Sequence, residues 1–531
     1  MSGAQKMRAL VWSISALFAF AVGLPAVWWE PLHLDEAIML RFATRSATDI
    51  VTDVFVDRGG APLQFLVEHL TLQWPGGLAG LRLPSLCFFA MAVVFAGLFT
   101  LELFGEREAL IVPPLLAAAP MAVELGTFAR MYALFLCFSL AAAWVALVAG
   151  RTNTRRAWLA AGTLVGGLVY VHPIAPLTCV AVVAGPLLVH ERPFRTTIRH
   201  AWPGLVVAVV LAAPYLYALA VLRQRYRVGE SSLLTATAGR SVPEEALHAV
   251  TPGGTAGAVV VTALAAFGLV RLARAAPRHA LAAGLWVVLP VVFFTLIPAE
   301  TRFFGRYVLP SLPAFLGLLA VGVLGLTGGR RVAAAAAVAA VLALEVADDA
   351  RRLDTLYVVG LSRLPAPPPG TVLFSSTGTP RSGRPPELLD DLLVLEHNES
   401  DRLEELPAID PRFDPDVVAN GAISVRRFLT RPKPASGMWV FSGRPERVQL
   451  ATRRLRKIPA VRSRVVSGQL LVIQTRAPED ASRLIELAIA VRSAWGLRSP
   501  SDRWPRAIVA ADRSGARWAR HTQADSTDVH R

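Results

Sequence analysis

Charged residues are scarce in this sequence, at 18% of 531 residues, which is below the roughly 25% of ordinary soluble domains. Hydrophobic residues make up 54%, and the mean hydropathy is +0.47. The apolar residues form long uncharged runs through most of residues 1–347, whereas charges gather in short loops and in the C-terminal third. This distribution argues against an ordinary soluble protein and predicts a polytopic, all-α membrane protein.

Lysine and cysteine are also rare. The lysines are Lys6, Lys433 and Lys457, so the net charge of +15 comes almost entirely from arginine. In a membrane protein this charge belongs to cytoplasmic loops and a basic soluble part, and no nucleic-acid partner is expected. The cysteines, Cys87, Cys137 and Cys179, lie within apolar runs. They predict neither a disulfide framework nor a metal site, and no cofactor is expected, although a divalent metal stays compatible with the sequence.

About 20 apolar residues are needed to cross a bilayer. The predicted spans are 9–29, 82–103, 110–123, 132–149, 157–171, 174–190, 201–221, 256–270, 280–298, 307–326 and 331–347. The first run resembles a signal peptide, but no cleavage pattern follows it, so we expect an uncleaved helix. No internal repeat is visible.

The stretch 62–75 is the ambiguous case, because it is short and carries Glu68 and His69 at its middle. A charge at a helix centre costs about 2.5–3.5 kcal/mol on insertion scales, so a juxtamembrane helix is predicted. Eleven spans with a cytoplasmic N-terminus then place the arginine-rich loops inside, as the positive-inside rule requires. Counting 62–75 as a span would reverse every later loop.

In this topology the segment after about residue 348 is extracytoplasmic. Apolar β-branched runs predict strands at 371–376, 438–443 and 469–475, with helices at 445–457 and 479–495. The predicted domains are therefore a transmembrane domain over 1–347 and a small α/β domain over 348–497. Residues 498–531 are poor in apolar residues and are expected to be disordered.

An acidic pair, Asp35 and Glu36, directly follows the first predicted span and faces outward. The ordinary interpretation is a helix start, since acids there cap free N–H groups and favour the helix dipole. The functional interpretation is a general base that draws a proton from an acceptor hydroxyl. Asp57, in the same outer loop, is either a second acid or a turn residue.

Basic and aromatic residues recur on the same face, at Arg130, Tyr132, Arg302, Arg306 and Tyr307. Interfacial anchoring explains them, because arginine snorkels and tyrosine favours the headgroup zone. Phosphate binding explains them equally, because guanidinium groups bind phosphate bidentately. His172, between two spans, is either an interfacial histidine with satisfied hydrogen bonds or a contact to donor or acceptor.

These residues belong to an ordered set of short motifs spread over residues 9–326. The motifs are Asp35-Glu36, Asp57 with Pro62-Leu63, Leu81–Ser85, Phe104–Arg107, Arg130–Leu134, His172 and Arg306–Pro313. The set resembles the lipid-carrier-dependent GT-C glycosyltransferases. The closest resemblance is to the family 39-like branch, which includes protein O-mannosyltransferases and aminoarabinose transferases. Four positions depart from that pattern: Gly60 replaces a histidine, Ala61 a proline, Phe128 an acid and Pro173 a tyrosine.

The resemblance implies a membrane glycosyltransferase at the outer face of a bacterial inner membrane. It would move a sugar, with inversion, from a polyprenyl-phosphate donor to a hydroxyl acceptor on a glycan, lipid or protein. Asp35 would be the base, assisted by Glu36 or Asp57. The implied phosphate-binding residues are Arg130, Tyr132, Arg302, Arg306 and Tyr307, with His172 contacting donor or acceptor.

Two other classes compete with this one. A transporter or flippase for lipid-linked sugars would place charged residues near the bilayer midplane, often in paired repeats. Here the polar candidates lie at predicted helix ends instead. A simple anchor for the C-terminal domain would not need eleven spans.

Overall fold

The computed structural model describes most of the chain up to residue 355 and four strands beyond it. The described ranges are 2–29, parts of 36–56, 60–73, 78–226, 241–250, 254–296, 305–355, 372–375, 437–442, 461–466 and 470–475. They fall into two compact units. The helical unit comprises 1–30, 38–227 and 240–352, and the second unit, which contains the strands, comprises 31–37, 228–239 and 353–531.

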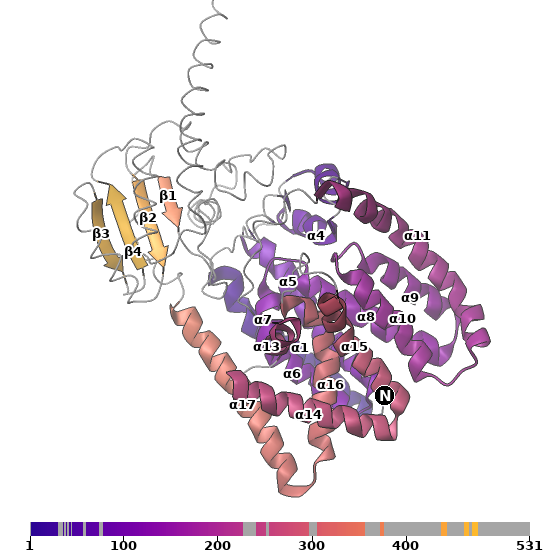
Figure 1. Cartoon of the computed structure of the whole chain (residues 1–531). Coiled ribbons are helices and arrows are strands. Elements are labelled where there is room, and N and C mark those ends of the chain that lie inside the picture. The colour runs from indigo at the N-terminus through magenta and orange to yellow at the C-terminus, as the bar shows by residue number, and fades with distance from the viewer. Residues whose placement is uncertain are drawn as a thin grey trace, which may run out of the picture. The chain divides into compact units, whose positions relative to one another are not determined.

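The helical unit consists of long apolar helices joined by short connections (Figure 1). The longer helices are α1 (Gly3–Trp29), α5 (Leu78–Leu103), α8 (Tyr132–Thr152), α9 (Arg155–Leu168), α10 (Ala175–Val189), α11 (Phe194–Tyr226), α14 (Gly254–Ala275), α15 (Pro277–Leu296), α16 (Leu312–Gly325) and α17 (Gly328–Thr355). The shorter ones are α3 (Ala47–Ile50), η1 (Val51–Val56), α4 (Leu63–Thr71), η2 (Glu108–Leu110), α6 (Val112–Ala118), α7 (Pro120–Thr127), α13 (Val242–Val250) and η3 (Gly305–Ser311).

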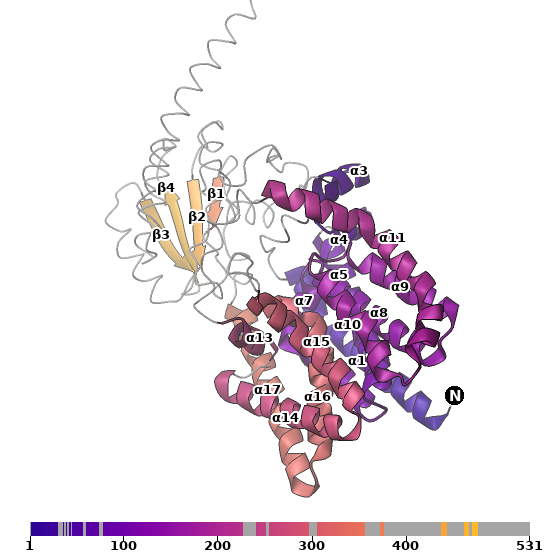
Figure 2. The ribbon, with the colours of Figure 1, turned by 45° about the vertical axis from the view of Figure 1, so that its right-hand side comes forward.

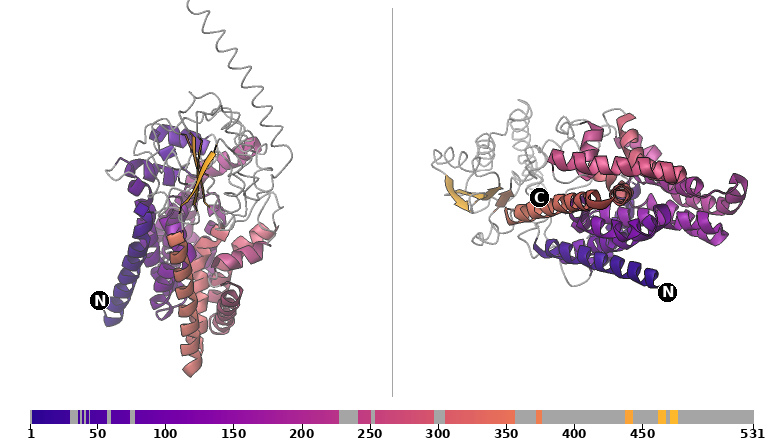
Figure 3. Two further views of the ribbon diagram at one scale, coloured as in Figure 1. Left: turned by 90° about the vertical axis from the view of Figure 1, so that its left-hand side faces the viewer. Right: turned by 90° about the horizontal axis from the view of Figure 1, so that it is seen from below.

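Seven described helices are long and apolar enough to cross a membrane, or eight if one bent pair counts as a span. Each of the eleven predicted spans falls on a described helix or helix pair, but the count of eleven is not confirmed. Helices α9 and α10 have only 14 and 15 residues, which rise about 21–23 Å, less than the roughly 30 Å of hydrocarbon. Helix α1, indigo in Figure 3, lies along one edge of the helical unit and exposes Leu10, Ile14 and Phe18.

The bent pair replaces the straight span that was predicted at 110–123. The helices on its two sides meet at an angle of 59°. The break falls at Ala119, whose ψ of 121° is extended, and α7 begins at Pro120. The bend follows from the sequence, because proline disfavours the α conformation in the residue before it.

Glycine lets two pairs of helices approach closely. Helices α9 and α11 run side by side (Figures 1 and 2), and a Cβ at Gly162 would lie 1.9 Å from the carbonyl oxygen of Gly204. Helices α14 and α16 repeat this arrangement, since a Cβ at Gly268 would lie 1.9 Å from the oxygen of Leu318. In lipid, where no hydrophobic force draws helices together, such close packing is a main source of association.

Helix α4 covers the segment around Glu68 that was predicted to be a juxtamembrane helix. Its nine residues rise about 14 Å, less than half of the hydrocarbon thickness. The polar residues are buried and paired. The Gln64 amide donates to Glu68 Oε1 at 2.7 Å and to Ser85 Oγ at 3.4 Å, and Arg82 donates to the Ala26 carbonyl at 2.8 Å. This network joins α4 to α5 and α5 to α1.

In the second unit, β1 (Val372–Ser375), β2 (Gly437–Ser442), β3 (Val461–Val466) and β4 (Leu470–Thr475) form one sheet in the order β1-β2-β4-β3. β1 pairs with β2 in parallel and the other pairs are antiparallel. Three strands fall within the predicted ranges or one residue beyond them, and β3 was missed. The predicted helices at 445–457 and 479–495 and the tail after 498 lie outside the described residues, so the α/β domain stays a prediction.

We expect Gly268→Ala to destabilise the protein by about 1–3 kcal/mol, the usual cost of overpacking, because the new methyl group would strike the α16 backbone. Gly284→Ala is the matched control: a Cβ at Gly284, on α15, meets no atom within 4 Å. This control should keep or slightly raise stability, since alanine favours helices. Thermal unfolding in detergent measures both, and equal melting temperatures would contradict the close α14–α16 contact.

Candidate active site

Three aromatic side chains from two separate elements, α8 and η3, meet around His172. This residue lies in the turn between α9 and α10, and its side chain is buried. Its ring stacks on Phe135 of α8 at 4.7 Å between centroids, and it lies 5.7 Å from Tyr132 and 5.9 Å from Tyr307 of η3. All of these positions are at the end of the helices where α8 begins and α9 ends, which is the outer end in the predicted topology. We call this group the His172 cluster.

Hydrogen bonding defines the protonation of His172. Its Nδ1 accepts a hydrogen bond from the backbone N–H of Ile174 at 3.2 Å. Burial, together with the positive charges of Arg130 and Arg306, lowers the pKa of His172 to about 3. The imidazole is therefore neutral at physiological pH, and its single proton belongs on Nε2. His172 can thus act as a neutral hydrogen-bond donor.

Two arginines bring positive charge to the His172 cluster. Arg306, in η3, places its guanidinium carbon 5.3 Å from the ring centroid of Tyr132, within the range of a cation–π interaction. Arg130 lies in the short connection between α7 and α8 and acts on His172 electrostatically. Two guanidinium groups next to a neutral N–H donor form an environment that suits a phosphate group.

Neighbouring side chains hold this arrangement in place. Phe128, where the resemblance leads one to expect an acid, stacks on Tyr132 with centroids 6.4 Å apart. Helix α13 packs Ala246 against Val308 and Phe294, and Phe294 stacks on Tyr307 at 5.5 Å. The Ser311 hydroxyl, at the end of η3, donates to the Trp286 carbonyl. The segment that carries Arg306 is therefore fixed to α13 and α15.

The structure brings together five of the nine candidate residues: Arg130, Tyr132, His172, Arg306 and Tyr307. Glu36 is helical and buried, at 1% exposed, and belongs to the second unit. Asp35, Asp57 and Arg302 lie outside the described residues. Within the described part of the chain, no group of three or more His, Cys, Asp or Glu side chains could hold a metal ion.

Sequence reasoning missed several aromatic neighbours. Phe135 is part of the His172 cluster, and a second group next to it contains Phe55, Tyr170 and Tyr215, with centroids 5.7–6.1 Å apart. Aromatic residues inside apolar helices look like packing side chains, so nothing in the pattern distinguished Phe135 or Tyr215. Tyr170 could have been noticed, because it precedes His172 by two residues.

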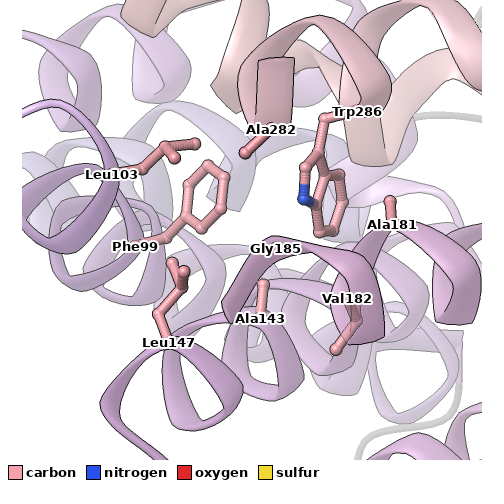
Figure 4. A pocket seen from close by; sticks show the side chains of 9 residues that line it. All are labelled: Phe99, Leu103, Ala143, Leu147, Ala181, Val182, Gly185, Ala282 and Trp286. Carbon is pink, nitrogen blue, oxygen red and sulfur yellow. The ribbon is translucent and has the colours of Figure 1, made fainter. Parts of the chain in front are cut away.

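An apolar cavity of about 10 Å³ lies between α5, α8, α10 and α15 (Figure 4). Phe99, Leu147 and Trp286 contribute to its wall. Leu147 is 15 residues after Tyr132 on α8, which corresponds to about 22 Å along the helix. The cavity is therefore far from the His172 cluster, and it has room for one water molecule at most.

Comparisons with known proteins confirm the resemblance to GT-C glycosyltransferases. The family model described as dolichyl-phosphate-mannose-protein mannosyltransferase matches residues 74–217. Among curated protein sequences, no significant match is found.

Two solved structures of ArnT from Cupriavidus metallidurans share the fold. The apo structure superposes with a TM-score of 0.52 and 16% sequence identity, covering 89% of this chain and 98% of ArnT. The structure of ArnT bound to undecaprenyl phosphate gives a TM-score of 0.50 and 16% identity, covering 88% and 97%. The chain is thus a multi-pass membrane protein with an ArnT-like fold.

The lowered pKa of His172 predicts a pH dependence of stability. Between pH 6.5 and about 3 the unfolded state binds a proton that the folded state does not. His172 therefore leaves the free energy of unfolding unchanged above pH 6.5. Below pH 6.5 it lowers the free energy of unfolding as the pH falls, by on the order of 1 kcal/mol per pH unit near pH 5.5. His172→Asn, which keeps an acceptor for the Ile174 amide, should flatten this slope. Unchanged slopes in melting curves from pH 7 to 5 would contradict the neutral, buried state of His172.

Proposed function

We propose that this protein is a membrane glycosyltransferase that moves a sugar from a polyprenyl-phosphate donor to a hydroxyl acceptor. The observation that carries the proposal is the His172 cluster, in which the charges of two guanidinium groups act on a neutral imidazole donor at the ends of apolar helices. The ArnT-like fold supports it, since ArnT has been solved bound to undecaprenyl phosphate. A phosphate carried on a lipid tail would reach the cluster from the membrane.

The donor phosphate would lie between Arg130 and Arg306, and Arg302 would add a third guanidinium. Arginine suits this role because its planar fork matches phosphate oxygens. The Nε2–H of His172 would donate to a phosphate oxygen, and Tyr132 would hold Arg306 in place through the ring contact. Tyr307 would form part of the wall of the phosphate site. These groups stabilise the departing phosphate as charge develops on it.

Sugar transfer would proceed by in-line displacement at the anomeric carbon. Asp35 would take the proton of the acceptor hydroxyl as its oxygen attacks, while Glu36 or Asp57 positions the acceptor. The bond from the anomeric carbon to the phosphate oxygen then breaks, and the polyprenyl phosphate leaves with the electron pair. A single displacement inverts the configuration.

The same proposal includes the orientation in the membrane. With the N-terminus in the cytoplasm of a bacterial inner membrane, the exposed arginines Arg155 and Arg156 lie inside, as the positive-inside rule expects. The His172 cluster and the C-terminal domain then face the extracytoplasmic side. The acceptor, a glycan, lipid or protein hydroxyl, would arrive from that side.

Arg306→Gln should weaken binding of undecaprenyl phosphate by roughly 10- to 100-fold, because a hydrogen bond to a charged group contributes about 1.5–3 kcal/mol. Arg306→Lys should recover only part of the affinity, since lysine lacks the planar fork. Arg155→Gln, an exposed arginine at the other end of the helices, is the matched control. Equal affinities for all four proteins, measured by scintillation proximity with labelled undecaprenyl phosphate, would exclude the cluster as the phosphate site.

Asp35→Asn should reduce sugar transfer at least 10²–10⁴-fold, the usual contribution of a general base. Expression and undecaprenyl phosphate affinity should stay near the wild-type values, because the amide is similar in size and lies outside the phosphate set. Transfer is measured in vesicles that contain the purified protein, a polyprenyl-phosphate sugar and a cell-envelope extract as acceptor. Near-normal transfer by the variant would remove Asp35 from the mechanism. Donor movement across the vesicle without transfer by the wild type would instead indicate a flippase.

A further inference from the structure

Tyr215 carries a buried hydroxyl that the mechanism above does not use. The residue lies on α11 and is 0% exposed. Its hydroxyl oxygen has no hydrogen-bond partner within the described part of the chain. Tyr170, its neighbour, is satisfied, because its hydroxyl donates to the Leu211 carbonyl at 2.7 Å. Buried polar groups are normally paired, so the hydroxyl of Tyr215 requires an explanation.

Among the described residues, the side chains packed against Tyr215 are uncharged, and two of them are aromatic. Its ring stacks on Phe55 at 6.1 Å and meets the edge of Tyr170 at 5.8 Å. Ala61 and Val169 are buried in the same small cluster. A phenylalanine would fill this volume equally well and would leave no polar atom unpaired. The hydroxyl therefore lowers the stability of the protein alone unless a partner arrives from outside.

The position of this cluster connects it to the candidate active site. Gly60 donates its N–H to the Val54 carbonyl at 2.7 Å, and Leu63 donates to the Tyr170 carbonyl at 3.1 Å. The segment that contains Ala61 is thus held between η1 and the turn that carries His172. A Cβ at Gly60 would lie 2.9 Å from the Val54 oxygen. The histidine that the family's pattern has at this position therefore does not fit this backbone. Tyr215, on α11, belongs to the same buried cluster as Ala61.

We infer that the Tyr215 hydroxyl binds a hydroxyl group of the donor sugar and contributes to sugar specificity. The inference rests on the proposed function, in which the arginines next to His172 hold the phosphate. A cluster of uncharged side chains favours a neutral ligand group over a phosphate. The sugar is the neutral polar part of the donor, and it lies next to the phosphate.

Tyr215→Phe in the full-length protein tests this inference. Without ligand, its melting temperature should equal or exceed that of the wild type, because an unpaired hydroxyl has been removed. Its affinity for undecaprenyl phosphate should be unchanged. Its KM for the sugar-carrying donor should rise roughly 3- to 10-fold, as expected for the loss of one neutral hydrogen bond. Tyr217→Phe, an exposed tyrosine on the same helix, is the control and should match the wild type throughout.

Three donors serve as probes: undecaprenyl phosphate that carries mannose, glucose or aminoarabinose. A lower melting temperature with an unchanged KM would show that a structural water satisfies the hydroxyl, and would overturn the inference. If the wild type binds undecaprenyl phosphate and transfers a sugar, and Tyr215→Phe does both equally well, the role of Tyr215 is excluded but the proposed function is not. If the wild type neither binds undecaprenyl phosphate nor transfers any of these sugars, the proposed function fails and the inference with it.

Discussion

The cost of placing charge in hydrocarbon governs where this chain can perform chemistry. A charged side chain at the centre of a membrane helix costs several kcal/mol, so charged groups in such a protein gather at helix ends or pair inside the bundle. Both outcomes are present. Glu68 and Arg82 are buried within the network around α4, whereas Arg130 and Arg306 lie where helices begin or end. The His172 cluster forms at the helix ends because guanidinium groups are tolerated there next to an apolar bundle.

The same medium explains how the bundle is held. Lipid gives helices no hydrophobic reason to associate, so close backbone contact takes over. Gly162 with Gly204 joins α9 to α11, and Gly268 joins α14 to α16. Helix α9 ends at the turn that carries His172, and η3 leads into α16. The precision of the cluster therefore depends on contacts between small residues that lie well away from it.

The sequence predicted the helical ranges well, because long apolar runs leave little choice in a membrane. The count of eleven spans is not confirmed, because α9 and α10 are short and the pair α6–α7 is bent at Pro120. Strand β3 was missed, because Arg462, Ser463 and Arg464 interrupt the apolar run there. The order of the motifs placed Tyr132, His172 and Tyr307 among the candidate site residues. Only tertiary structure shows that these three rings meet across 175 residues of chain. Tyr215 and Phe135 could not be predicted, since an aromatic residue in an apolar helix gives no sign of whether it packs or binds.

The central claim is that the His172 cluster binds the phosphate of a polyprenyl carrier. A cryo-electron microscopy structure of the full-length protein in nanodiscs with undecaprenyl phosphate tests it most directly. The account predicts phosphate density within hydrogen-bonding distance of the Arg130 and Arg306 guanidinium groups and of His172 Nε2. Phosphate density at any other place, with the cluster unchanged and empty, would contradict it.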